Sequence, residues 1–439
     1  MATPLLRYSE AAEQVHRFLV ALAAGGEIPA LGSAPASHSS RPAAGTAATE
    51  MVPLGVAPGR VLAIGIHADR DQPPFPRSTR DGFACRAAEA NTHQLLFLAE
   101  QIRAGQQPGK ALQAGEMVEI MTGAPVPEGA DCVVMQEYVE HSSNFVRQVA
   151  PRTIEPGENI VAQGAEARAG DLLLPVGVRL AAAQIALAAQ CGCHEVAVYT
   201  RPRVAILSSG DELVAVDAVP GPGQIRNSNT PMLAALVSAA GAVPVLLATA
   251  RDQAEALDAA LAQALAPGSR IDLLLITGGI SVGRFDLVEE ALSRAGARFF
   301  FGGVAIQPGK PVAFGQLARP ENGRATRAPL PFFALPGNPV SSAVTFQLFA
   351  LPLLSALAED TALQPRFALA RLSGDWRGKA GLTRFLPAWC DFTLEPTVRL
   401  VAWQGSGDIA AFAASNCYLV VPDVAGELTE GALVRILLR

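Results

Sequence analysis

The sequence predicts a multidomain protein in which an α/β domain is combined with β-rich domains. The chain has 439 residues, a length that suggests about three domains. Apolar runs alternate with helical patterns over residues 201–357, which is typical of a sheet covered by helices. Residues 71–160 and 365–439 instead carry short β-like runs without a long helical pattern. Half of the residues are hydrophobic and 17% are charged, so the composition indicates folded domains rather than global disorder.

Residues 1–26 are expected to contain one amphipathic helix, over about residues 9–24. The apolar residues at helical spacing are Val15, Phe18, Leu19 and Leu22. The apolar part of a signal peptide is the alternative interpretation, but Glu10 and Glu13 lie where a signal would be basic. The helix is therefore favoured. Residues 27–48 are rich in Pro, Ser, Ala and Gly, a composition typical of a flexible linker or insertion.

Residues 49–70 and 161–200 are expected to pack together as one discontinuous domain around the β-rich domain at 71–160. The first segment suggests a short helix at 57–60 that leads into a strand at 61–68. The second suggests strands on either side of an alanine-rich helix, at 172–174, 181–190 and 196–199. In the β-rich domain the clearest strands are 132–135 and 145–149.

Residues 201–357 are expected to form the α/β domain. Apolar runs of strand length occupy residues 204–207, 243–248, 273–276 and 331–335. Helices are expected between and after them, at 230–241, 253–266, 287–294 and from about 340 onward. Thr230 is the predicted N-cap of the first helix, with Pro231 at its first position and Gly241 at its end. Because the strands are almost continuously apolar, the sheet is expected to be parallel and covered on both faces.

The last segment, residues 365–439, is expected to form a small β-barrel or sandwich. Its short alternating runs include 419–421 and 433–437.

The charge and cysteine content restrict the classes of partner. A formal net charge of −6 argues against a nucleic-acid binder, which would normally carry a basic stripe. Six scattered cysteines suit a reducing cytoplasm better than a disulfide scaffold. No membrane span is expected, because the most apolar run, 343–358, is interrupted by Gln347 and Pro352. Residues 191–194 (CGCH) lack a second Cys/His pair, so we interpret them as a helix that ends at Gly192 rather than as a zinc site.

Three polar loops are expected at the carboxyl ends of the α/β strands, where open sheets bind ligands. They are residues 208–212 (SSGDE), 277–283 (TGGISVG) and 336–341 (PGNPVS). Glycines let the backbone approach a ligand and expose N–H groups that bind oxyanions. Asp286 and Glu212 add carboxylates of the kind that hold Mg²⁺ beside a phosphate. The residues therefore suggest a phosphate-plus-metal site.

Each of these residues also has a structural alternative. Asp286 precedes a helix and could be its N-cap, and Ser341 could cap the helix that it begins. Glu212 could be solvated surface, and the PGNP loop could serve only as a tight turn.

Four segments resemble the MoeA-type molybdopterin molybdenumtransferases, a family related to the gephyrin E domain. They are residues 73–84 (PPFPRSTRDGFA), 121–137 (MTGAPVPEGADCVVMQE), 277–286 (TGGISVGRFD) and 335–342 (LPGNPVSS). Residues 404–407 and 413–416 resemble the family's C-terminal domain. The resemblance covers residues 9–24 and 49–439. It implies a MogA-like α/β domain, a β-rich insertion domain, a discontinuous N-terminal domain and a C-terminal β-barrel.

The resemblance also implies an elongated homodimer in which each active site is built from two subunits. Asp81, Thr122 and Glu166 would come from one subunit, and Glu212, Asp252, Asp286, Pro336 and Pro339 from the other. The implied substrates are adenylylated molybdopterin and molybdate, with Mg²⁺ on Glu212 and Asp286 and with release of AMP. The residues expected to bind the pterin or molybdate are Thr277, Gly278, Gly279, Ser281, Gly283, Lys310, Pro336, Gly337, Asn338, Pro339 and Ser341. A molybdopterin adenylyltransferase and recipient molybdoenzymes are the expected partners, and neither nucleic acid nor membrane is expected.

Departures from the family pattern affect the expected anion site. Gln307 and Gly303 stand where some members have lysine, so Lys310 is expected to supply the charge for molybdate, together with Ser341. Glu166 stands where many members have the shorter Asp, and Phe83 replaces Tyr. Two other functions remain open from the residues alone: an ATP-dependent molybdopterin adenylyltransferase, and a non-catalytic scaffold.

Overall fold

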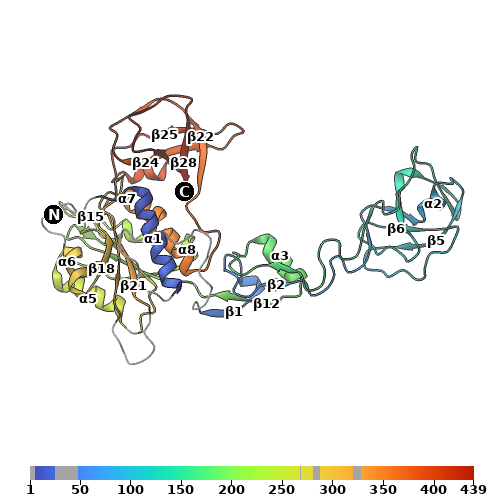
Figure 1. The fold of residues 1–439 in the computed structure, drawn as a ribbon, viewed down its shortest axis with the longest axis horizontal. Helices are drawn as coiled ribbons and strands as arrows, with labels where there is room; N and C mark the ends of the chain where they lie inside the picture. The colour runs from blue at the N-terminus through green and yellow to red at the C-terminus, as the bar shows by residue number, and fades with distance from the viewer. Residues whose placement is uncertain (1–4, 25–47, 267, 280–286, 320–327) are drawn as a thin grey trace.

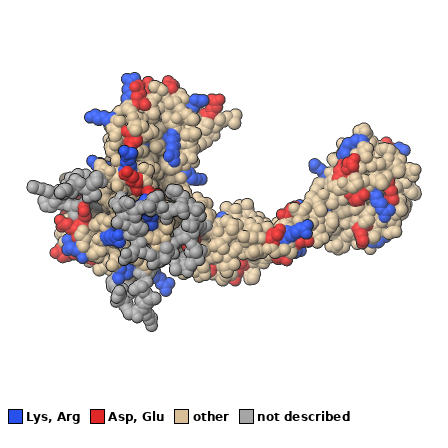
Figure 2. Space-filling model, viewed as in Figure 1, with Lys and Arg blue, Asp and Glu red and all other residues tan. Residues whose placement is uncertain are grey.

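The computed structural model describes residues 5–24, 48–266, 268–279, 287–319 and 328–439. The molecule is elongated, with an α/β domain and a barrel at one end and a β-rich body at the other (Figure 1). A narrow arm that contains α3 joins the two ends. Acidic and basic side chains are interspersed over the face that Figure 2 shows.

The α/β domain is built on a six-stranded sheet of order β16-β13-β17-β21-β20-β18. The strands are β13 (Arg203–Ser208), β16 (Val243–Leu246), β17 (Leu273–Thr277), β18 (Arg298–Phe301), β20 (Ala313–Leu317) and β21 (Leu330–Leu335). The four strands from β16 to β21 are parallel, as predicted. The sheet is nevertheless mixed, because β20 pairs antiparallel with β21, and β18 in turn pairs antiparallel with β20; neither strand was predicted.

Helices cover both faces of this sheet. They are α1 (Tyr8–Ala24), α4 (Asn229–Ala239), α5 (Ala254–Leu265), α6 (Leu287–Arg294), α7 (Pro339–Thr345) and α8 (Leu351–Leu357). Val204 and Ile206 of β13 point into a core shared with α1, α4, α7 and α8. Ala205 and Leu207 alternate with them and pack against α5 and α6. This alternation explains why β13 is apolar at every position from 204 to 207.

Two helix predictions in this domain need correction. The helix α4 begins at Asn229 rather than after Thr230, because the Asn227 side chain accepts a hydrogen bond from the Thr230 backbone N–H at 3.1 Å. The stretch Pro339–Leu357 is long and apolar enough to cross a membrane, although the run was expected to be too interrupted for that. Because 72% of its apolar window is buried in the protein, the expectation that it spans no membrane is not contradicted. A π-helical turn, Phe346–Ala350, precedes Pro352, which has no N–H to donate to the preceding turn.

The arm is a small body made of two separate chain segments. Its elements are β1 (Thr49–Pro53), the 3₁₀ turn Leu54–Val56, β2 (Ile66–His67), β11 (Leu172–Leu174), α3 (Ala182–Gln190) and β12 (Glu195–Tyr199). The pairings β1–β12 and β2–β11 are antiparallel and join the two segments. The helix expected at 57–60 is absent, because Gly59 has a φ of 77° and turns the chain. The helix α3 ends at Gln190 with Cys191 as its C-cap, and Gly192 follows with a φ of 76°.

The distal body is a six-stranded sheet of order β7-β4-β6-β5-β9-β8. Its strands are β4 (Gly82–Cys85), β5 (Leu96–Ile102), β6 (Glu116–Ile120), β7 (Cys132–Met135), β8 (Val139–Ser142) and β9 (Phe145–Gln148). Its described residues contain one short α-helix, α2 (Ala87–Ala90), and one 3₁₀ turn, Gln136–Tyr138. The two-stranded ladder of β3 (Arg77–Ser78) and β10 (Ile160–Val161) leads from the arm into this body.

The C-terminal region is a closed barrel, which confirms one of the two predicted architectures. Its strands are β22 (Phe367–Leu372), β24 (Thr383–Asp391), β25 (Thr397–Leu400), β26 (Cys417–Val421) and β28 (Leu433–Leu438). The order β24-β25-β22-β28-β26 closes because β26 also pairs with β24. The strand β19 (Ile306–Gln307) of the preceding domain adds to β24 and so ties the barrel to the α/β domain.

Candidate active site

Three loops converge at the carboxyl ends of β13, β17 and β21, as predicted. A Cβ atom on Gly278 would lie 2.0 Å from the Ser209 carbonyl oxygen, and one on Gly337 would lie 3.5 Å from the Gly278 Cα atom. Gly278 also has a φ of 93°, which disfavours any other residue. The loops therefore meet through their backbones, and only glycine fits at the centre.

Buried polar groups hold these loops together. The Thr277 hydroxyl accepts a hydrogen bond from the Asn229 amide at 2.9 Å and donates one to the Pro336 carbonyl at 3.2 Å. The Asn229 amide also donates to the Gly337 carbonyl at 2.6 Å, and the Ser342 hydroxyl donates to the Pro336 carbonyl. The buried Asn229 Oδ1 atom has no hydrogen-bond partner among the described residues. Asn229 was missed from the sequence, because it precedes the expected start of its helix and no motif marked it.

Carboxylates lie at the neighbouring strand ends. Asp252 accepts a hydrogen bond from the Ser209 hydroxyl at 2.6 Å, and its backbone N–H donates to Asp211 at 3.2 Å. The exposed Glu212 carboxylate lies against Gly210, where a Cβ atom would come within 2.5 Å of it. The expected site residues Gly279 and Pro339 border the same loops, whereas Ser281, Gly283 and Asp286 lie outside the described residues.

The donor set near β13 is compatible with Mg²⁺. Within the described ranges, no cluster of three or more His, Cys, Asp or Glu side chains could enclose a metal ion. Mg²⁺ is usually held by one or two carboxylates together with substrate phosphates and water, so an enclosed cage is not required. The oxygen-only chemistry of Glu212 and Asp252 fits this type of coordination.

Lys310 and Ser341 lie on two segments that pack together. Lys310 is exposed in the turn after β19, and a Cβ atom on Gly309 in this turn would lie 2.6 Å from Thr345 of α7. Thr345 in turn donates to the Ser341 carbonyl at 2.8 Å, and the Ser341 side chain is buried. The helix cap position belongs to Asn338 rather than to Ser341. Asn338 instead donates to the Ser406 hydroxyl of the C-terminal region at 2.8 Å.

Arg384 of β24 is a second cation that the sequence did not reveal. Its Nε atom donates to the Gln307 side chain at 3.0 Å, and Arg384 is only 9% exposed. The pairing of β19 with β24 brings the two residues together although 77 positions separate them. Gln307 is uncharged, and Arg384 of the barrel places a positive charge beside it.

The remaining predicted residues lie in and near the distal body. The backbone N–H and the hydroxyl of Thr122 donate to the Asp81 carboxylate at 2.7 and 2.8 Å. These two bonds, the backbone one first, lower the pKa of Asp81 below its ordinary value. Glu166 forms an exposed ion pair with Arg77 at 2.6 Å.

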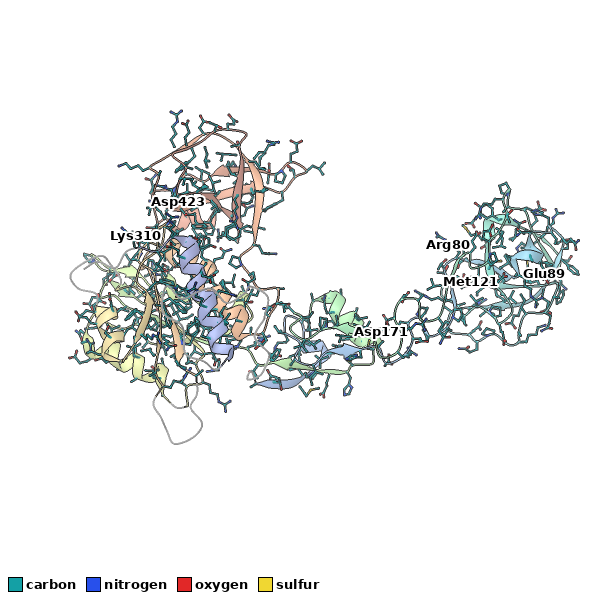
Figure 3. The ribbon with its side chains drawn as sticks, in the orientation of Figure 1. Arg80, Glu89, Met121, Asp171, Lys310 and Asp423 are labelled. Carbon is teal, nitrogen blue, oxygen red and sulfur yellow. The ribbon has the colours of Figure 1, made fainter. Side chains whose placement is uncertain are left out.

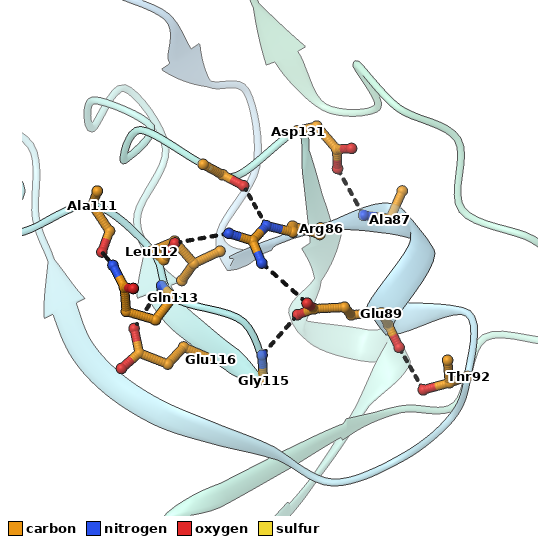
Figure 4. Close-up of polar contacts among 11 residues, drawn as sticks. Arg86, Ala87, Glu89, Thr92, Ala111, Leu112, Gln113, Gly115, Glu116 and Asp131 are labelled. Atoms are coloured by element: carbon orange, nitrogen blue, oxygen red, sulfur yellow. Dashed lines mark hydrogen bonds and ion pairs between the residues drawn. The ribbon is translucent and has the colours of Figure 1, made fainter.

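The distal body is braced by its own polar contacts (Figure 4). Arg86 donates to the carbonyls of Gly129 and Leu112 at 3.2 and 3.1 Å and pairs with Glu89 at 3.1 Å. Asp131 accepts a hydrogen bond from the Ala87 backbone at 2.7 Å. These bonds fix the loops around β4, the strand that directly follows Asp81.

A single chain does not bring the two groups of predicted residues together. Arg80 and Met121, the neighbours of Asp81 and Thr122, lie at the opposite end of the molecule from Lys310 (Figure 3). We call the predicted residues of the three loops the loop group, and Asp81, Thr122 and Glu166 the distal group. The two groups are separated by the arm.

Three family models match successive parts of the chain. The MoeA N-terminal region (domain I and II) matches residues 10–192, a probable molybdopterin binding domain matches 205–356, and the MoeA C-terminal region (domain IV) matches 369–438. A molybdopterin molybdenumtransferase of Nostoc sp. is 40% identical over 314 residues, 70% of this chain and 69% of that protein. The one from Bacillus subtilis is 33% identical over 400 residues, 89% of this chain and 90% of that protein. A crystal structure of a molybdopterin biosynthesis MoeA protein from Pyrococcus horikoshii aligns with a TM-score of 0.77 at 26% identity, covering 99% of this chain and all of that one.

Proposed function

Because the chain belongs to the MoeA family of molybdopterin molybdenumtransferases, we propose that it inserts molybdate into adenylylated molybdopterin and releases AMP. The convergence of three glycine loops beside carboxylates is the observation that carries this proposal. In the reaction, water cleaves the pyrophosphate bond, so that AMP leaves and the other phosphate stays on the pterin. The two dithiolene sulfurs then replace one oxygen of molybdate, which leaves with the two thiol protons as water.

The loops supply the groups that a phosphorylated pterin needs. Gly278 and Gly337 let the ligand approach the backbone, whose N–H groups favour phosphate oxygens. The Oδ1 atom of Asn229, which has no partner in the described part of the chain, offers an acceptor for a ligand N–H group. The residues of the loop group therefore bind and orient the pterin, together with Ser281 and Gly283.

The carboxylates would hold Mg²⁺ next to the pyrophosphate. Glu212 and Asp286 are the proposed ligands, and the ion would polarise the phosphoryl oxygens. Asp252 is oriented by the Ser209 hydroxyl, and it lies close enough to the loops to align the bound substrate.

Molybdate needs donors and positive charge, because it is a dianion. Lys310 offers an exposed ammonium, and Arg384 adds a guanidinium beside Gln307. Ser341 lies on the helix against which the Lys310 turn packs. We assign these residues to the molybdate pocket, apart from the Mg²⁺ carboxylates.

The distal group would complete the site of a second chain in a homodimer. Asp81 and Thr122 directly follow Arg80 and Met121, which Figure 3 shows far from Lys310, so they cannot serve the loops of their own chain. Glu166 pairs with Arg77 of the ladder that leads into the distal body. The arm also exposes a set of large apolar side chains that a second copy could cover: Met51 (59% exposed), Val56 (65%), Ile64 (65%) and Leu172 (54%). A molybdopterin adenylyltransferase would supply the substrate, and cytoplasmic molybdoenzymes would receive the product.

An assay with the full-length protein tests this function. The protein is incubated with adenylylated molybdopterin, Mg²⁺ and molybdate, and AMP release and the reconstitution of an apo-molybdoenzyme are followed. We expect both, with AMP and active cofactor formed in equal amounts. Consumption of ATP with free molybdopterin would instead indicate an adenylyltransferase. If neither reaction occurs, the result would favour a non-catalytic scaffold.

A further inference from the structure

The junction between the arm and the α/β domain determines where the distal body lies. On one side the chain crosses this junction directly, since β12 ends at Tyr199 and β13 begins at Arg203. Such a short connection permits rotation unless side chains restrain it. Because the arm is long, a small rotation at the junction would displace the distal body by much more (Figure 1).

Arg179 of the arm joins three segments at this junction. Its Nε and Nη2 atoms donate to Asp360 Oδ2, at 2.7 and 2.5 Å. Its Nη1 atom donates to the Gly59 carbonyl at 2.8 Å, and Nη2 also donates to the Ala240 carbonyl at 3.0 Å. Gly59 belongs to the arm, Ala240 is the C-cap of α4, and Asp360 follows α8. One planar guanidinium thus fixes the arm against two parts of the α/β domain.

The surroundings of this guanidinium show that the contact is specific. The Asp360 side chain is fully buried, and its second oxygen accepts a hydrogen bond from the Ala362 backbone at 2.9 Å. A Cβ atom on Gly241 would lie 2.7 Å from Arg179 Nη1, so only glycine leaves room for the arginine. Next to it, the Thr361 backbone and hydroxyl donate to the arm's Gly177 carbonyl at 3.2 and 3.1 Å. Removal of the arginine would leave a buried carboxylate without its partner.

We propose that Arg179 is a positioning residue that fixes the angle of the arm and thereby the place where Asp81 and Thr122 meet the loops of a second chain. The proposal rests on the two-chain active site described above. Arg179 does not contact the substrate in this scheme, and it acts only through the direction of the arm. Misplacement of catalytic groups by about 1 Å can lower a rate on the order of 100-fold.

Distances between two spin labels test the restraint directly. One label is placed on the distal body at Gln94→Cys and one on α5 at Gln263→Cys, in a Cys193→Ser background because Cys193 is the described native cysteine that is not buried. Labelled chains are diluted with unlabelled chains, so that only distances within one chain are measured by pulsed electron paramagnetic resonance.

We expect Arg179→Met to broaden the distance distribution and to lower kcat on the order of 100-fold, with little change in the KM for the pterin substrate. Arg179→Lys keeps the charge but not the planar fork, so it should broaden the distribution less. Arg294→Met is the matched control, because it removes an arginine ion pair with Asp258 inside the α/β domain. It should change neither the distances nor kcat.

An unchanged distance distribution in folded Arg179→Met would overturn the proposal. If that variant does not fold, an unchanged distribution in Arg179→Lys has the same consequence. A broadened distribution with unchanged kcat would overturn the role in catalysis. Failure of the unmodified protein to release AMP would reject the proposed function instead, and the distance measurement would still decide the restraint.

Discussion

The loop group of the α/β domain and the distal group on the far body hold their polar side chains in opposite ways. Thr277 is buried and bonded to Asn229 at the start of α4 and to Pro336 after β21, so the loops are fixed within one chain. Asp81 and Glu166 are exposed, and each has a bond to a single neighbouring residue. The difference indicates that the loops form a preorganised binding site, whereas the distal side chains must be delivered to it by the arm.

Gly278→Ala should have the largest effect, because it breaks the loop group at its centre. The new Cβ atom would lie 2.0 Å from the Ser209 carbonyl, at a φ of 93° that alanine rarely adopts. We expect AMP release to be lost and the free energy of unfolding to fall by about 1–3 kcal/mol. Gly302→Ala is the matched control, since its Cβ atom would meet nothing within 4 Å. Equal activity and stability of the two variants would contradict a tightly packed loop site.

Lys310→Ala should have an intermediate effect on activity, and this effect should be confined to the binding of molybdate. Loss of one charge-assisted contact costs about 1.5–3 kcal/mol, or roughly ten- to over a hundredfold in affinity. The molybdate concentration for half-maximal activity should rise accordingly, and excess molybdate should partly restore activity. Binding of the adenylylated pterin, measured by calorimetry, should change less. Impaired pterin binding with an unaltered molybdate response would place Lys310 in the phosphate site.

Thr122→Ala should have the smallest effect and should appear in the pH dependence. The pKa of Asp81 is lowered in the folded protein, so the carboxylate remains ionised until the pH falls through that lowered value. The variant loses the hydroxyl bond but keeps the stronger backbone bond, so the acid limb of activity should move modestly to higher pH. Stability should hardly change, because Asp81 is exposed. An acid limb that does not move would show that the ionisation of Asp81 does not control the reaction.

The sequence predicted which loops form the loop group, but it did not predict which side chains contact one another there. Apolar runs that end in glycine loops predicted the strand ends correctly, because continuous burial leaves a clear pattern. Asn229 and Arg384 were not predicted, since their roles depend on contacts with Thr277 and Gln307 that no local pattern encodes. The antiparallel pairings of β20 with β21 and of β18 with β20 were missed as well, since strand direction depends on long-range pairing. The roles of the predicted site residues remain predictions, and Ser281, Gly283 and Asp286 lie outside the described residues.

The separation of the two groups was implied only by the family resemblance. Helical and strand periodicity report which side of an element is buried, but not how far apart two bodies lie. The ladder of β3 and β10 and the pairing of β1 with β12 together place the distal body beyond the arm. The sharing of one active site between two chains therefore calls for a direct test.

Subunit complementation provides that test. Asp81→Ala and Asp252→Ala chains are expected to be inactive alone, because each lacks one group of the site. In a mixed dimer one site would combine the intact loops of the first chain with the intact distal group of the second. Random mixing of equal amounts should then restore about a quarter of the unmodified activity, since half of the dimers are mixed and each has one intact site. Mixed dimers that are verified by two affinity tags and still release no AMP would contradict a site shared between two chains.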